Sequence, residues 1–131
     1  MTADPETQPL RIVIADDQTV VREGLEMVLD VMPNLEVVAT VADGEQALRA
    51  VSEHRPDAIL LDLHMPDERI LDAEYIRTRL RPVGSEIKII GISLSGNDDQ
   101  EARELAASLG ACTVLEKSRF YDELIPAILS C

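Results

Sequence analysis

The chain has 131 residues, of which 46% are hydrophobic and only 2% are aromatic. This length fits a single domain with a sizeable core, and that core must be aliphatic because the chain has so few aromatic residues. The formal net charge of −13 argues against nucleic acids and anionic membrane surfaces as direct partners.

The N-terminal residues are acidic and contain Pro5 and Pro9, unlike a secretory signal. We therefore expect a flexible segment at residues 1–9 and one domain at residues 10–131. No apolar run is long enough to cross a bilayer. The two cysteines, Cys112 and Cys131, are too few for a disulfide framework and suit reduced thiols. Together these features predict a cytoplasmic protein without membrane contact.

Five short apolar runs alternate with five helical patterns along the chain. The predicted strands cover residues 11–15, 36–41, 58–62, 88–93 and 112–115. The predicted helices begin near Thr19, Asp43, Arg69, Asn97 and Ser118. Thr19 is the expected N-cap of the first helix. Asp43 and Gln46 form a capping-box-like pair at the second helix, and Gly110 closes the fourth.

The third strand is the most informative element. Its four apolar residues 58–61 lie between Asp57 and Asp62, as in a strand that is buried on both faces in the middle of a parallel sheet. Strict alternation of strands and helices predicts parallel strands, right-handed crossovers and helices on both faces. The expected fold class is a doubly wound α/β domain with five strand–helix units.

Polar residues stand where the predicted strands end. Asp16 and Asp17 follow the first strand, Asp62 ends the third, Ser93 ends the fourth, and Lys117 follows the fifth. The carboxyl ends of parallel strands meet at one edge of the sheet, where ligands bind. Three adjacent carboxylates need a cation to stay ionised together, and Mg²⁺ accepts carboxylate oxygens while leaving room for a phosphoryl oxygen. A lysine and a hydroxyl beside them suit phosphoryl transfer.

This order of residues, together with Asp62-Leu63-His64-Met65-Pro66, resembles the response-regulator receiver domains of bacterial two-component systems from about Leu10 to Leu129. Segments 17–25 and 92–95 are most similar to receivers fused to a LuxR/NarL-type helix-turn-helix domain. The resemblance implies a flavodoxin-like (βα)5 fold with parallel sheet order 2-1-3-4-5. It also implies that any DNA contact belongs to an output domain absent from these residues.

The resemblance also implies roles for the site residues. Asp62 would accept a phosphoryl group from a sensor histidine kinase or phosphotransfer protein. Asp17 would bind Mg²⁺ directly and Asp16 through water, with the His64 carbonyl completing the protein ligands. Ser93 and Lys117 would contact the phosphoryl group, so that phosphorylation shifts the domain toward an active conformation. Such a domain performs self-phosphotransfer and autodephosphorylation only, and is not otherwise an enzyme.

Some residues depart from the family pattern at positions through which the family passes its signal to an output domain or partner. Arg69 and Ile70 replace the usual Asp-Gly pair, Val114 replaces the switch aromatic, and Ser118 replaces the commoner proline after the lysine. These departures support an alternative, a pseudo-receiver that binds proteins without being phosphorylated. The residues also leave open a small aspartate-dependent phosphatase, a transition-metal site involving His64, and a homodimer through either the first and fifth or the fourth and fifth helices.

Overall fold

A computed structural model describes residues 9–63, 87–93, 100–117 and 120–130. The predicted helix near residues 69–81 and residues 1–8 of the predicted flexible segment lie outside this part of the chain. Within it, no helix has both the length and the apolar character needed to cross a membrane.

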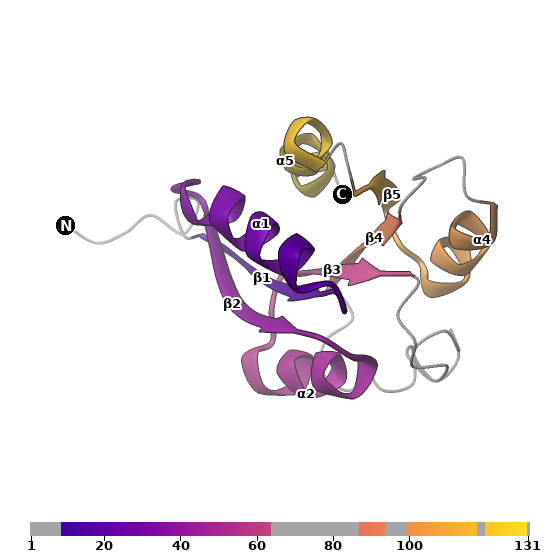
Figure 1. Cartoon of the computed structure of the whole chain (residues 1–131), viewed down its shortest axis with the longest axis horizontal. Helices are drawn as coiled ribbons and strands as arrows, with labels where there is room; N and C mark the ends of the chain where they lie inside the picture. Colours follow the sequence, from indigo (N-terminus) through magenta and orange to yellow (C-terminus); the bar gives the residue numbers. More distant parts are fainter. Residues whose placement is uncertain (1–8, 64–86, 94–99, 118–119, 131) are drawn as a thin grey trace.

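Strands and helices alternate through the described residues, except that the residues between β3 and β4 lie outside them (Figure 1). The strands are β1 (Leu10–Ala15), β2 (Leu35–Val41), β3 (Ala58–Asp62), β4 (Lys88–Ser93) and β5 (Thr113–Glu116). The helices are α1 (Thr19–Asp30), α2 (Gly44–His54), α4 (Gln100–Leu109) and α5 (Phe120–Ser130).

The five strands form one parallel sheet in the order β2-β1-β3-β4-β5, which confirms the predicted topology. β3 lies in the middle, and all five of its residues are buried. The β1–β2 register shifts by one residue between Ile12 and Val13. After this shift Ala15 pairs with Val41, and the Asp16 N–H donates to the Val41 carbonyl at 3.1 Å, so the end of β1 is held in place by β2.

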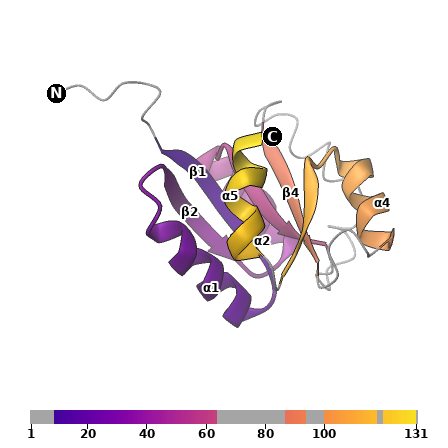
Figure 2. The ribbon, with the colours of Figure 1, turned by 90° about the horizontal axis from the view of Figure 1, so that it is seen from above.

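Two apolar layers cover the two faces of this sheet. Alternate strand residues point to opposite faces, and both faces are apolar because both are covered by helices. One layer packs α1 and α5 on the sheet, and Figure 2 views the molecule from the side of these helices. The other layer packs α2 and α4 on the opposite face. The buried side chains are aliphatic in both layers, as the composition predicts.

The helix ends follow the predicted signals in two cases and differ in a third. The Asp43 carboxylate accepts from the Gln46 N–H at 2.8 Å, and Gly110 has a positive φ of 74° after α4, both as predicted. The expected N-cap Thr19 is wrong, because Gln18 is the N-cap of α1 and Thr19 is already helical. The Thr19 hydroxyl accepts from the Arg22 guanidinium at 3.1 Å, so it has a partner within the helix.

The edge of the sheet where the strands begin, which we call the amino edge, is closed by Arg11 and Asp57. The Arg11 N–H donates to Asp57 Oδ2 at 2.8 Å, and the Asp57 N–H donates to the Arg11 carbonyl at 2.7 Å. The Arg11 guanidinium also donates to the His54 carbonyl at the end of α2. These bonds satisfy backbone groups at the strand starts, which are costly to leave unpaired.

Cys112 is disulfide-bonded, so the prediction of a reduced thiol is wrong for this residue. The reason is topological. Cys112 immediately precedes β5 at the amino edge, and whether a cysteine can pair depends on which residues the fold brings within about 7 Å of it. The linear sequence does not reveal this proximity.

Gly91 in β4 gives a test of how β3 and β4 pack. A Cβ atom on Gly91 would lie 2.7 Å from Leu63 Cδ1 and 3.2 Å from Leu63 Cγ, and Leu63 directly follows Asp62. We expect Gly91→Ala to lower the free energy of unfolding by about 1–3 kcal/mol, the usual cost of overpacking, as measured by urea denaturation. In a Leu63→Ala background the same substitution should cost less than half as much. An equal cost in both backgrounds would show that the contact with Leu63 is not the cause.

Candidate functional site

Two adjacent aspartates follow β1, and their environments are very different. Asp16 is fully buried and Asp17 is exposed. The Asp16 Oδ1 accepts from the Gln18 N–H at 2.8 Å, and the Asp16 carbonyl accepts from Arg22 Nη1 at 2.7 Å. These two bonds, together with the bond from its own N–H to β2, fix both the backbone and the carboxylate of Asp16.

β3, β4 and β5 bring the other predicted side chains to the same edge, which we call the carboxyl edge. Asp62 is the last residue of β3 and is 1% exposed, and Ser93 is the last residue of β4 and is fully buried. Lys117 follows β5, and its N–H donates to the Ser93 carbonyl at 2.8 Å. The backbone of Lys117 is therefore joined directly to the strand that carries Ser93.

The ammonium of Lys117 crosses the carboxyl edge to reach three side chains. It donates to Asp16 Oδ1 at 3.3 Å, to Asp62 Oδ2 at 3.2 Å and to Gln18 Oε1 at 3.1 Å. An ammonium has three N–H donors, so these bonds account for all of them. The Lys117 side chain is only 8% exposed, and opposite charges this close and this well buried attract strongly.

The three aspartates form an acidic cluster that could bind a metal. Asp16, Asp17 and Asp62 each offer a carboxylate oxygen, and these oxygens all lie within 4.8 Å of one another. The Asp16 Oδ2 is buried and, within the described residues, accepts no hydrogen bond, although Lys117 Nζ lies 3.0 Å away as an ion-pair partner. A hard cation with oxygen ligands would use this atom, so the residues fit the predicted group.

His64, whose carbonyl was predicted as a further metal ligand, lies outside the described residues. The other predicted site residues, Asp16, Asp17, Asp62, Ser93 and Lys117, come together at one edge of the sheet. Two residues that contact them were not predicted, namely Gln18 and Arg22. Arg22 has no signal in the sequence, since its bond to the Asp16 carbonyl depends on how α1 leaves β1. Gln18 has none either, because the sequence favours Thr19 as the N-cap and Gln18 meets Lys117 only in the folded chain.

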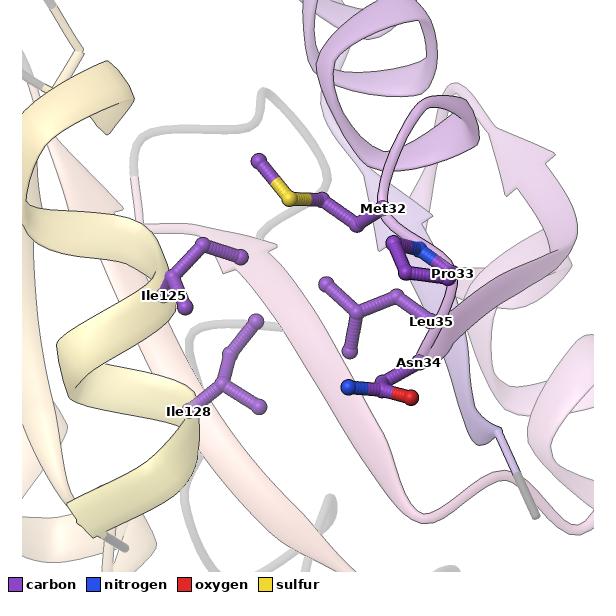
Figure 3. Close-up of a pocket in the computed structure, with 6 residues that line it drawn as sticks. All are labelled: Met32, Pro33, Asn34, Leu35, Ile125 and Ile128. Carbon is purple, nitrogen blue, oxygen red and sulfur yellow. The ribbon is translucent and has the colours of Figure 1, made fainter. Parts of the chain in front are cut away.

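A small apolar cavity lies at the other end of the sheet, near the start of β2. Its volume is about 80 Å³, and it is lined by Met32, Pro33, Asn34, Leu35, Ile125 and Ile128. In Figure 3, the two isoleucines of α5 face the turn between α1 and β2. The cavity offers no titratable group, so its lining does not suit catalysis.

The sequence model of the response regulator receiver domain family matches residues 12–129 of the chain. The chain belongs to this family. The sheet order and the acidic cluster agree with the assignment, and the domain is called a receiver below.

The receiver is similar to curated relatives over part of its length. It is 56% identical to the oxygen regulatory protein NreC of Staphylococcus epidermidis over 57 residues, and 53% identical to NreC of Staphylococcus haemolyticus over the same number. Each match covers 44% of the chain and 26% of the relative. The matched segment therefore spans about a quarter of these longer proteins.

Solved structures resemble the receiver over nearly all of its length. The signal receiver domain of NarL from Mycobacterium tuberculosis has a TM-score of 0.79 and 29% identity, covering 95% of this chain and 96% of that one. A LuxR-family two-component response regulator from Aurantimonas sp. has a TM-score of 0.73 and 30% identity, covering 94% and 84%. CheY6 of R. sphaeroides, solved with the P1 domain of CheA3, gives 0.76 and 27%, covering 94% and 96%. The similarities to NarL and to the LuxR-family regulator support the predicted LuxR/NarL-associated subgroup.

The acidic cluster predicts a divalent cation site that depends on Asp17. We expect Asp17→Asn to weaken Mg²⁺ binding by about tenfold or more, because a charged oxygen ligand is lost from a site with few of them. Isothermal titration calorimetry measures the affinity. Glu53→Gln, an exposed change on α2 that removes the same charge, is the control. Equal weakening in both variants would mean that Mg²⁺ responds only to the net charge.

Proposed function

We propose that this receiver accepts a phosphoryl group on Asp62 from the phosphohistidine of a sensor histidine kinase or phosphotransfer protein, and that phosphorylation switches its conformation. The observation that carries the proposal is the burial of Asp62 at the carboxyl edge, with Lys117 Nζ 3.2 Å from its Oδ2. The solved pair of CheY6 with the CheA3 P1 domain supports this class of partner.

In the proposed reaction, an Asp62 carboxylate oxygen forms a bond to phosphorus as the phosphorus–nitrogen bond of the phosphohistidine breaks. The imidazole leaves with the bonding electron pair and takes up a proton. Mg²⁺ held by Asp17 and Asp62, and by Asp16 through water, would offset the charge on the phosphoryl oxygens. Hydrolysis of the product by water returns Asp62 to its starting state.

Lys117 and Ser93 act on the phosphoryl group from the protein side. The Lys117 ammonium already lies between Asp16 and Asp62, so it can move to a phosphoryl oxygen without leaving the site. Charge-assisted hydrogen bonds of this kind contribute about 1.5–3 kcal/mol. Because about 1.4 kcal/mol changes an equilibrium constant tenfold, one new bond at Ser93 or Lys117 is enough to shift β4, β5 and their helices between two conformations.

The proposal assigns this receiver no reaction beyond self-phosphotransfer and autodephosphorylation. It places the domain in the cytoplasm, with any DNA contact made by an output domain outside these residues. The subgroup assignment and the longer NreC relatives support transcription regulation as the output.

A pseudo-receiver, which binds proteins without phosphorylation, is the second candidate. The observation that favours it is Val114, which is buried in the layer under α4 at the position of the family's switch aromatic. A β-branched side chain has restricted rotamers, so it cannot report phosphorylation by swinging between two positions. The valine therefore affects how a signal would leave the domain, and it leaves the acidic cluster unchanged.

Phosphorylation of Asp62 separates the two candidates. We expect acetyl phosphate with Mg²⁺ to give a shifted band on a Phos-tag gel and a mass increase of one phosphoryl group, both of them absent in Asp62→Asn. Glu53→Gln, an exposed change at the end of α2, should behave as wild type because it removes an equal charge near the amino edge, where the His54 carbonyl contacts Arg11. If wild type and Asp62→Asn are both unmodified, the pseudo-receiver is correct.

A homodimer is also part of the proposal, and the structure favours α1 as one of its elements. Val20, Met27 and Val31 are large apolar residues that are 72–82% exposed, and they recur along one side of α1. We expect Met27→Asp to abolish dimers formed with beryllofluoride, because it puts a charge in the apolar contact. Light scattering after gel filtration measures the mass. The control is Ala107→Asp, on the exposed side of α4. If Ala107→Asp abolishes the dimer and Met27→Asp does not, the dimer forms through α4 and α5 instead.

A further inference from the structure

Gln18 occupies the N-cap of α1 without capping it. Its backbone is extended there, with φ −90° and ψ 113°, and its side chain makes no hydrogen bond to the first turn. N-cap positions favour Ser, Thr, Asp or Asn because a short side chain can accept from the free N–H groups of that turn. A longer side chain that leaves those groups alone points to a role elsewhere.

The Gln18 side chain reaches Lys117 at the other end of the domain sequence. Its Oε1 accepts from Lys117 Nζ at 3.1 Å, which is the shortest of the three hydrogen bonds made by this ammonium. Its backbone N–H donates to Asp16 Oδ1 at 2.8 Å. Gln18 therefore contacts both members of the Asp16–Lys117 ion pair.

The chemistry of the amide distinguishes Gln18 from the other two partners of Lys117. Asp16 and Asp62 are carboxylates of the acidic cluster, and both are drawn into new contacts when a cation and a phosphoryl group enter. The Gln18 side chain is a neutral amide and does not belong to the three carboxylates, Asp16, Asp17 and Asp62, that form the acidic cluster. It can hold one N–H of Lys117 throughout the reaction without adding a fourth negative charge beside the incoming phosphoryl group.

We propose that Gln18 is a positioning residue for Lys117 in phosphoryl transfer to Asp62. This inference rests on the proposed function. Gln18 does not touch the reacting atoms. It holds the ammonium by one hydrogen bond, so that the other two N–H groups face the carboxylates and, during transfer, the phosphoryl oxygens. The side chain makes this bond and leaves the α1 cap unmade, so a substitution that restores the cap should stabilise the helix and yet slow phosphorylation.

Three substitutions separate positioning from helix capping. Gln18→Ser restores a favoured cap and cannot reach Lys117. Gln18→Met keeps the length of the side chain and removes the amide acceptor. Gln18→Glu keeps the length and an acceptor and adds a negative charge to the site.

We expect Gln18→Ser to raise the urea midpoint of unfolding and yet to lower the rate of phosphorylation by acetyl phosphate, at saturating Mg²⁺, about three- to tenfold. Gln18→Met should lower the rate by a similar factor with little change in the midpoint. Gln18→Glu should bind Mg²⁺ more tightly than wild type and still be phosphorylated more slowly, because the added charge competes with the phosphoryl oxygens for Lys117. Wild-type rates in both Gln18→Ser and Gln18→Met would overturn the proposal.

A second measurement tests the positioning without any phosphorylation. Acetic anhydride labels amines by their accessibility, and peptide mass spectrometry reports the extent at each lysine. We expect Lys117 to be labelled faster in Gln18→Met and Gln18→Ser than in wild type, while Lys88, which starts β4 at the amino edge, is labelled equally in all three. Unchanged labelling of Lys117 would overturn the inference. If Lys117 is labelled faster in both variants but acetyl phosphate does not modify the wild-type receiver, the positioning role is retained and the proposed phosphorylation is rejected.

Discussion

The contact between the Lys117 ammonium and the buried carboxylates of Asp16 and Asp62 is the interaction on which the site depends. Removing charges from water is costly, and a buried ion pair is tolerated only where the geometry offsets that cost. Here Asp16 follows β1, Asp62 ends β3 and Lys117 follows β5. Their attraction joins β1, β3 and β5 at one edge of the sheet.

The sheet order makes this contact feasible. β3 lies between β1 and β4, and β5 pairs with β4, so Lys117 must extend across the end of β4 to reach Asp62 and Asp16. The bond from its backbone N–H to the Ser93 carbonyl sets the starting point of that reach. Under the proposed function, a phosphoryl group that entered among these groups would change the partners of Lys117 and Ser93 together. This coupling is what a switch built on one edge of a sheet requires.

The fold and the clustering of the site could be predicted from the sequence because both follow from short-range patterns. The run 58–61 between two acids identifies a central strand, and the polar residues at the strand ends converge once the strands are parallel. The contacts of Gln18 and Arg22 could not be predicted in the same way. They depend on the angle at which α1 leaves β1, which is set by packing of Leu25 and Leu29 on the sheet. The disulfide of Cys112 likewise depends on which residues the fold brings together. The side chain at the N-cap of α1 leaves the cap unmade and bonds to a distant lysine, which no local preference predicts.

The closure of the amino edge by Arg11 and Asp57 has a consequence for how this domain tolerates change. Charged groups there are matched to backbone partners and complete the hydrogen bonding of the strand starts, whereas those at the carboxyl edge form the acidic cluster and its ion pairs with Lys117. The two edges are separated by the length of a strand. Substitutions at the strand starts can therefore change thermal stability without changing the chemistry at the strand ends. In this domain the usual trade-off between stability and activity is reduced by the distance between the two edges.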